Sequence, residues 1–200
     1  EVSSNTIKKP SVSGVYVSGG SDKNTISGNT ITSAGSNGIK ITKKAKADVR
    51  KNTVKKSKNH GLIYTGGSGK ASDNTLEENG LCGFMADNSA SVEFFYNTCN
   101  NNKDYGLKAD KKSQVKISGN SFADNSKGDI YVTGSAAVLL NAPDNVKSQD
   151  ICSDKLTVTW DEVSQADGYY VYRKTDDEGA EFEQIATVTD GTYYTDYGLV

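Results

Sequence analysis

Two aspartates, Asp87 and Asp110, are the residues of this chain best suited to hold a metal ion, because they lie 23 residues apart. If they stack on neighbouring turns of a repeating fold, their backbones lie about 5 Å apart. Two carboxylates at that distance repel each other unless a proton or a cation lies between them. Ca²⁺ binds such oxygen ligands but takes roughly six to eight of them, and Asn88 is the one obvious third donor. The alternative is a pair of solvated carboxylates balanced by Lys108 and Lys111.

A band of basic residues between positions 40 and 58 is a candidate for binding, since only Asp48 opposes it. The band consists of Lys40, Lys43, Lys44, Lys46, Arg50, Lys51, Lys55, Lys56 and Lys58. Positive charge of this density attracts polyanions, and we expect an acidic polysaccharide. We expect no nucleic acid, because Arg is nearly absent and no recognition motif is present. The alternative is a solubilising face, with ion pairs such as Lys51–Asp73 and Lys55–Glu77 between neighbouring turns.

Two adjacent aromatic residues, Phe95 and Tyr96, are expected at the surface. They could stack on a sugar ring or pack beneath a loop. His60 is the only histidine, and the chain has no Ser-His-Asp set, no metal-binding Cys/His cluster and no phosphate-binding loop. We therefore expect no complete catalytic site in these residues and no required cofactor, with Ca²⁺ as the one candidate ion.

These candidates are positioned by a repeat of about 23 residues. An Asn-Thr-apolar triplet recurs at spacings of 22 to 24, with Ser in place of Thr in the last copy, and its asparagines are Asn5, Asn29, Asn52, Asn74, Asn97 and Asn120. An apolar residue lies three positions before each asparagine, and five copies continue with Gly-apolar-x-apolar, as in Gly38-Ile39-Lys40-Ile41. Apolar residues alternate with others inside each copy, which indicates strands.

The repeat predicts an all-β fold in which each copy forms one coil of a solenoid. Stacking the coils at about 4.8 Å buries the apolar columns and pairs each backbone with the coils above and below. We expect about six coils over residues 1–140. The asparagine column should form a ladder of side-chain hydrogen bonds. We expect the asparagine and glycine columns to lie at corners, where the backbone turns left-handed, and to be structural.

The motif apolar-x-x-Asn-Thr-apolar followed by Gly-apolar-x-apolar resembles that of the right-handed parallel β-helix family, the pectate-lyase-like solenoids. The resemblance covers roughly residues 1–140 and implies the right hand of the coil. Members include polysaccharide lyases, glycoside hydrolases, epimerases and non-catalytic surface proteins. In the lyases Ca²⁺ bridges enzyme and uronate and a Lys or Arg is the base, which implies Lys108 as a candidate base beside Asp87 and Asp110. The polygalacturonase pattern around His60 is incomplete, because Asn-Thr-Asp, Arg-x-Lys and a pair of aspartates are missing.

Residues 141–200 form a second region, in which four alternating runs at 155–160, 168–173, 181–188 and 192–196 predict antiparallel strands. The region resembles a fibronectin type III domain: Trp160 matches its core tryptophan, and Tyr172 ends its third-strand motif. The last two strands of that family would follow Val200. We therefore expect an incomplete β-sandwich and a chain that is part of a longer protein. Such domains act as spacers or adhesion modules beside carbohydrate-active regions.

The charges of the two regions differ. The chain has 200 residues with 23 Lys+Arg and 25 Asp+Glu, but residues 1–149 hold 20 basic and 13 acidic side chains, whereas residues 150–200 hold 3 and 12. Such a split indicates two domains. The longest uncharged apolar run, residues 136–140, is far shorter than the ~20 residues of a membrane helix, so we expect no membrane insertion.

Three functions are consistent with these features. The first is binding or display of an acidic polysaccharide by part of an exported β-helix protein, extracellular or at the cell surface, with no catalysis in this chain. The second is a Ca²⁺-dependent polysaccharide lyase or epimerase acting through Lys108, Asp87 and Asp110. The third is a passive stalk or adhesin. In each case we expect a monomer.

Overall fold

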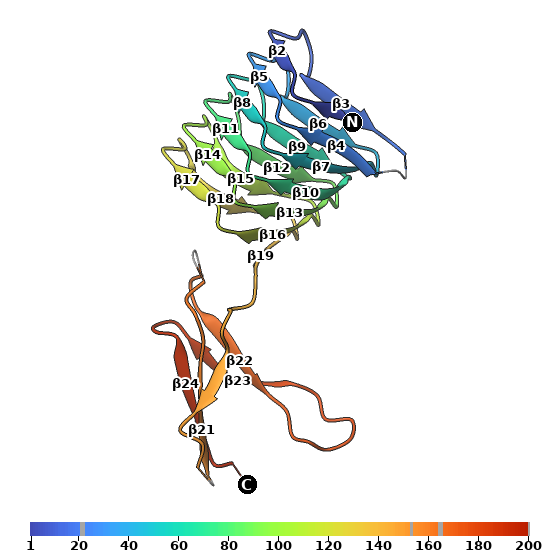
Figure 1. The fold of residues 1–200 in the computed structure, drawn as a ribbon. Helices are drawn as coiled ribbons and strands as arrows, with labels where there is room; N and C mark the ends of the chain where they lie inside the picture. Colours follow the sequence, from blue (N-terminus) through green and yellow to red (C-terminus); the bar gives the residue numbers. More distant parts are fainter. Residues whose placement is uncertain (21–22, 153, 164–165, 200) are drawn as a thin grey trace. The chain divides into compact units, whose positions relative to one another are not determined.

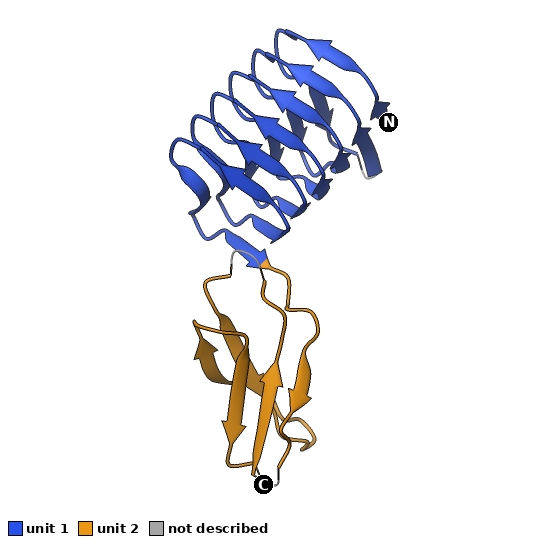
Figure 2. Cartoon of the chain, turned by 60° about the vertical axis from the view of Figure 1, so that its left-hand side comes forward, with its two compact units in different colours: residues 1–139 blue, residues 140–200 orange. Residues whose placement is uncertain are grey.

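The computed structural model describes residues 1–20, 23–152, 154–163 and 166–199 (Figure 1). The chain divides into two compact units, residues 1–139 and residues 140–200 (Figure 2). The sequence places this division one residue later, after position 140. The regular structure of the described residues consists of strands, and none of these residues forms a helix long and apolar enough to cross a membrane.

Three parallel sheets build the first unit, and each coil contributes one strand to each sheet (Figure 1). Sheet A contains β1 Val2–Ser3, β4 Lys23–Ser27, β7 Lys46–Arg50, β10 Ser68–Ser72, β13 Ser91–Phe95, β16 Gln114–Ser118 and β19 Ala137–Leu140. Sheet B contains β2 Thr6–Lys8, β5 Thr30–Thr32, β8 Thr53–Lys55, β11 Thr75–Glu77, β14 Thr98–Asn100 and β17 Ser121–Ala123. Sheet C contains β3 Val15–Ser18, β6 Ile39–Thr42, β9 Leu62–Thr65, β12 Phe84–Asp87, β15 Tyr105–Ala109 and β18 Gly128–Val132.

Equivalent residues of successive repeats pair in register. Ile31 pairs with Val54 in sheet B, and Val54 in turn pairs with Leu76, so one copy of the repeat is one coil. The predicted parallel solenoid of about six coils is therefore confirmed. Its physical basis is that each coil supplies only a narrow apolar strip, which becomes buried when the coils above and below cover it.

The core is made of the apolar columns read from the repeat. Fully buried side chains of sheet A, such as Phe94, face those of sheet C, such as Phe84. These two rings stack with centroids 4.3 Å apart, and Tyr64 meets Phe84 edge-on at 6.2 Å. The Tyr64 hydroxyl donates a 2.7 Å hydrogen bond to the carbonyl oxygen of Ala47, and burial raises its pKa. The buried hydroxyl of Tyr64 is thus satisfied by the backbone.

The asparagine column forms a continuous ladder between sheets A and B. The Nδ2 atom of each asparagine donates to Oδ1 of the next, at distances of 2.9–3.1 Å, along Asn5, Asn29, Asn52, Asn74, Asn97 and Asn120. The prediction that these asparagines adopt the left-handed conformation is wrong. The left-handed residue is the one before each asparagine, namely Ser4, Gly28, Lys51, Asp73, Tyr96 and Gly119. The asparagines themselves need a conformation that points their side-chain amides along the solenoid axis, toward the asparagine of the next coil.

The glycine column also has a different role from the one predicted. Gly14, Gly38, Gly61, Gly83 and Gly106 have no positive φ angle. A Cβ atom on Gly38 would overlap the side chain of Val54 and lie 2.6 Å from the carbonyl oxygen of Gly61. Glycine is therefore required here by close packing of the coil against its own core and its neighbour, and not by backbone conformation.

The second unit contains two small antiparallel sheets (Figure 2). One has the order β20-β21-β24, with β20 Lys147–Gln149, β21 Lys155–Thr159 and β24 Tyr193–Tyr197. The other pairs β22 Tyr169–Arg173 with β23 Glu183–Val188. The two sheets are joined by Arg173, whose Nη1 atom lies 2.9 and 3.0 Å from the two carboxylate oxygens of the buried Asp196. Four of these strands match the predicted runs, and β20 was not predicted.

Candidate functional site

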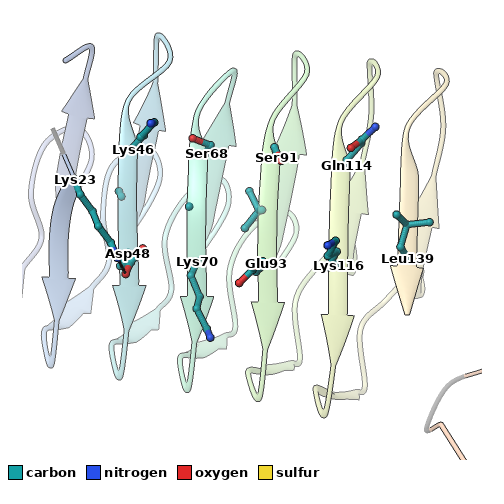
Figure 3. Close-up of a pocket in the computed structure, with 13 residues that line it drawn as sticks. Lys23, Lys46, Asp48, Ser68, Lys70, Ser91, Glu93, Gln114, Lys116 and Leu139 are labelled. Atoms are coloured by element: carbon teal, nitrogen blue, oxygen red, sulfur yellow. Dashed lines mark ion pairs between the residues drawn. The ribbon is translucent and has the colours of Figure 1, made fainter. Parts of the chain in front are cut away.

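The outer face of sheet A carries many charged side chains beside space for a ligand. Strand alternation turns Ala47 and Val49 inward, so Lys46, Asp48 and Arg50 of β7 point outward. On the outer face, negative and positive side chains alternate from one coil to the next. Figure 3 shows this alternation for Asp48, Lys70, Glu93 and Lys116. Register places Lys70 beside Glu93 and Glu93 beside Lys116.

Two adjoining hollows lie on this face, with volumes of about 610 and 560 Å³, and they share Asp48 and Lys70. Figure 3 shows the first of them. The cations that line the two hollows are Lys23, Lys46, Arg50, Lys51, Lys70 and Lys116, and the carboxylates are Asp48, Asp73 and Glu93. We call these nine residues and the hollows they line the sheet A groove. Its lining is positively charged, because its six cations outnumber its three carboxylates.

The groove can attract an extended polyanion and bind it through charge-assisted hydrogen bonds. The Lys23 Nζ atom lies 2.7 Å from Asp48, but the Lys23 side chain is mostly exposed. An ion pair so exposed contributes about 0–1 kcal/mol, so a ligand that displaces it meets little resistance. The groove lining also includes Ser68, Ser72 and Ser91, whose hydroxyls can donate to or accept from a polar ligand.

The structure distributes the predicted basic band over all faces of the solenoid. Its members on sheet A or in the turn that follows are Lys46, Arg50 and Lys51, all of which line the groove. Lys40 is on sheet C, where its Nζ lies 5.9 Å from the centroid of the Tyr16 ring. Lys43 and Lys44 are left-handed residues in the turn between β6 and β7. Residues close in sequence are separated because one coil turns through three faces.

The sheet B part of the band forms ion pairs between coils. Lys55 lies 2.7 Å from Glu77, and a hydrogen bond and the charge of Glu77 raise the pKa of Lys55. Lys56 lies 3.4 Å from Glu78. The predicted Lys51–Asp73 pair is not among the ion pairs formed by the described residues. These lysines therefore fit the solubilising alternative better than a binding role.

Phe95 and Tyr96 lie next to the groove. Phe95 ends β13 and pairs in register with Ser72, a groove residue. The Lys70 Nζ atom lies 5.1 Å from the centroid of the Phe95 ring. Tyr96 follows in the turn, and its side chain is 65% exposed. The sequence left open whether this pair faces solvent or packs beneath a loop, and the structure places Tyr96 in solvent.

The outer face of sheet C holds the residues proposed for metal binding and proton transfer. The Lys111 Nζ atom lies 3.3 Å from Oδ1 of Asp87, whereas Oδ1 of Asp110 accepts a hydrogen bond from the backbone N–H of Lys111. Lys108 lies with its Nζ 5.4 Å from the Tyr131 ring. The two carboxylates thus already have donors, as in the alternative of balanced, unbridged carboxylates.

The predicted calcium site has few oxygen ligands in this arrangement. Among the residues that the structure describes, no three His, Cys, Asp or Glu side chains come close enough to hold a metal ion together. Asp87 and Asp110 alone provide too few oxygen ligands for Ca²⁺, and Lys111 competes for one of them. A role for Lys108 as base with Ca²⁺ at Asp87 and Asp110 stays a prediction.

One outward position of this face is buried. The alternation of β12 places Met85 on the outside, where solvent exposure is expected, but its side chain is only 8% exposed. Its register neighbours are Ile63 on β9 and Lys108 on β15. An outward position on a sheet is buried when long neighbours on both sides cover it.

A buried polar corner between sheets B and C was not found from the sequence. The Nδ1 atom of His60 accepts a 3.3 Å hydrogen bond from the backbone N–H of Cys82. The Cys82 thiol donates to a carboxylate oxygen of Asp104 at 3.4 Å, and Lys127 lies 2.9 Å from the other oxygen. The sequence did indicate that Asp104 and Lys127 could meet, because they are 23 residues apart, which is the length of one coil.

The ionisation states at this corner are unsuitable for nucleophilic catalysis. Burial lowers the pKa of His60 to about 4 and raises the pKa of Cys82 to about 12. Burial also raises the pKa of Asp104, but hydrogen bonds from Lys127 and Cys82 and the charges of Lys127 and Lys108 lower it overall. Near neutral pH the corner therefore contains a neutral imidazole, a thiol and an ion pair. Because the thiolate is the reactive form of cysteine, the buried, protonated Cys82 is a poor nucleophile.

Comparison with known proteins identifies the family to which the chain belongs. No curated protein and no solved structure matches the chain. The family model described as the right handed beta helix region matches residues 1–142, and thereby all three sheets of the solenoid and its asparagine ladder. The narrower likenesses, to pectate-lyase-like solenoids and to fibronectin type III domains, stay predictions. Because the matched residues cover more than half of its length, the chain belongs to the right-handed beta-helix family.

Proposed function

We propose that the solenoid binds an acidic polysaccharide along the outer face of sheet A, as part of an exported protein that holds this polysaccharide at the cell surface. The right-handed β-helix fold is consistent with a carbohydrate-associated or a structural protein. The observation that carries the proposal is the sheet A groove, in which six cations from four coils line two adjoining hollows.

The shape of the groove favours a long ligand over a small one. Its residues come from strands stacked about 4.8 Å apart, so the cations repeat along the solenoid axis. A chain of uronate units presents carboxylates repeatedly along its length and can engage several of these cations together. Contacts that are individually weak in water then add to useful affinity.

Affinity electrophoresis of the full chain through gels containing pectate, alginate or a glycosaminoglycan tests the proposal. Retardation by at least one of these polysaccharides is expected. A groove variant then replaces four cations with glutamine at Lys46, Arg50, Lys51 and Lys70. The matched control removes the same charge from other faces at Lys8, Lys40, Lys43 and Lys44. We expect the groove variant to lose about tenfold or more in affinity and the control to keep most of it.

Two outcomes would contradict this function. Equal losses in both variants would mean that net charge alone attracts the polysaccharide. A wild-type chain that none of the polysaccharides retards would favour the second candidate, a structural stalk. The continuous asparagine ladder supports that candidate, because it stiffens the solenoid without needing a ligand. Running each gel with Ca²⁺ and with a chelator also tests the predicted role of Asp87 and Asp110.

A further inference from the structure

Tyr96 occupies a position where a tyrosine is costly. It is the left-handed residue before the ladder asparagine of its coil, with a φ angle of 55°. The equivalent residues of the other coils are Ser4, Gly28, Lys51, Asp73 and Gly119. A bulky side chain is disfavoured in the left-handed region, and residues in such conformations gather at functional sites. The conformation of Tyr96 therefore calls for a compensating benefit.

The ring of Tyr96 does not obtain that benefit from the core. Its side chain is 65% exposed. One edge of the ring lies against Gly119 on the next coil, where a Cβ atom would come within 2.5 and 2.6 Å of ring atoms Cδ1 and Cε1. Because Gly119 has no side chain, the edge of the ring can pack against it, while most of the ring stays exposed to solvent.

The surroundings of Tyr96 combine aromatic surface with positive charge. Phe95 precedes it, with the Lys70 ammonium 5.1 Å from its ring centroid. The hollow lined by Arg50 and Lys51 ends at Asp73, whose backbone N–H donates to the carbonyl oxygen of Phe95. Tyr96 is thus one coil beyond the end of this hollow and two coils from Lys51, about 10 Å along the axis.

We propose that Tyr96 is the platform on which one pyranose ring of the acidic polysaccharide stacks, while Arg50, Lys51 and Lys70 bind carboxylates of the neighbouring sugar units. This inference rests on the proposed function and adds a site of recognition to it. The face of an aromatic ring carries negative charge density and attracts the C–H groups on the apolar face of a pyranose. Cations alone accept any polyanion, whereas the addition of an aromatic platform selects polyanions built from sugar rings.

Tyr96→Gly separates binding from folding, since Gly28 and Gly119 show that glycine suits this position. In the full chain we expect it to raise the midpoint of thermal unfolding by a few degrees, because strain is removed. We expect the same variant to weaken binding of the retained polysaccharide about tenfold or more. Binding of poly-glutamate, which has carboxylates but no sugar rings, should not change. Tyr96→Phe should bind like the wild type, since stacking needs the ring and not the hydroxyl.

Tyr16→Ser is the matched control, because Tyr16 is an exposed tyrosine on sheet C. If Tyr96→Gly binds the polysaccharide as tightly as the wild type, the platform is wrong. If the groove variant loses binding at the same time, the proposed function stands and only the platform falls. An equal loss in Tyr16→Ser would also overturn it. If the wild-type chain binds no polysaccharide, the proposed function and the platform fall together.

Discussion

The two units of this protein use similar strand-forming residues but bury them to very different extents. Among the described residues, 26 of the 27 buried hydrophobic side chains lie in the solenoid, and Trp160 is the one in the second unit. Many large hydrophobic side chains of the second unit are exposed, including Tyr170, Phe182 and Tyr197. The solenoid covers every inward column with the next coil, whereas two small antiparallel sheets have no repeating neighbour to cover them.

The units also differ in how they treat buried polar groups. In the solenoid, each interior ladder asparagine donates to the next coil and to backbone carbonyls. In the second unit, Arg173 binds the buried carboxylate of Asp196, whereas the indole Nε1 of Trp160 is buried and has no hydrogen-bond partner. A buried polar atom without a hydrogen-bond partner is costly, and the solenoid also contains such atoms, among them Ser57 Oγ and Asn100 Oδ1.

The largest expected effect is the loss of an interior ladder residue. Asn74→Ala removes bonds to Val49 and Asn97 and leaves the backbone N–H of Asn52 without its acceptor, while the Asn52 amide keeps the carbonyl oxygens of Ile26 and Arg50. We expect the free energy of unfolding to fall by about 3–5 kcal/mol, since each buried group left unpaired costs about 1–3 kcal/mol. Urea unfolding followed by far-UV circular dichroism measures this change.

Asn5→Ala is the control, because Asn5 is at the exposed end of the same ladder. We expect it to cost about 1 kcal/mol. Equal costs at Asn5 and Asn74 would show that burial does not set the strength of the ladder.

A smaller effect is expected from pH, and it should be confined to the solenoid, which contains the only histidine. Burial, opposed by the charges of Asp104 and Asp87 and aided by that of Lys108, lowers the pKa of His60 from 6.5 to about 4. The unfolded chain therefore binds a proton before the folded chain as pH falls. Stability should decrease between pH 6.5 and 4, by about 2–3 kcal/mol in total.

The test is the free energy of unfolding measured from pH 7 to pH 4 by circular dichroism. In His60→Gln the part of the slope between pH 6.5 and 4 that comes from this residue should disappear. Trp160 is the only tryptophan, so its fluorescence reports the second unit separately. A pH dependence that survives in His60→Gln would assign the effect to the carboxylates.

The smallest expected effect comes from a matched pair of aromatic substitutions, one in each unit. Tyr64→Phe removes a hydroxyl that bonds to Ala47 and should cost about 1–2 kcal/mol. Trp160→Phe removes a donor that has no partner, so we expect no loss from hydrogen bonding and a net change of about 1 kcal/mol or less. Thermal unfolding of both variants, followed by circular dichroism, provides the comparison. A larger loss at Trp160 would mean that its ring packing outweighs its unsatisfied donor.

The sequence was sufficient to predict the coil but insufficient to predict the candidate site. The spacing of Asn29, Asn52 and Asn74 predicted the register of whole coils, because equivalent residues must stack for the ladder and the core to form. The same spacing could have revealed the ion pair between Asp104 and Lys127. The same spacing also aligns Lys70, Glu93 and Lys116 on one face, but the hollows of the sheet A groove depend on where each coil bends, which the repeat does not show.

The sequence by itself determined that this is a parallel solenoid, since a repeat places the same residue types in the same surroundings in every copy. Only the tertiary structure decided which face each outward residue occupies. The bends are made by left-handed residues as different as Lys51, Asp73 and Tyr96, which share no residue type that a pattern could recognise. Three such turns in each coil distribute the basic band of residues 40–58 over several faces. The same turns bring cations from different coils together on sheet A. The groove is a property of the stack, because no single coil contains it.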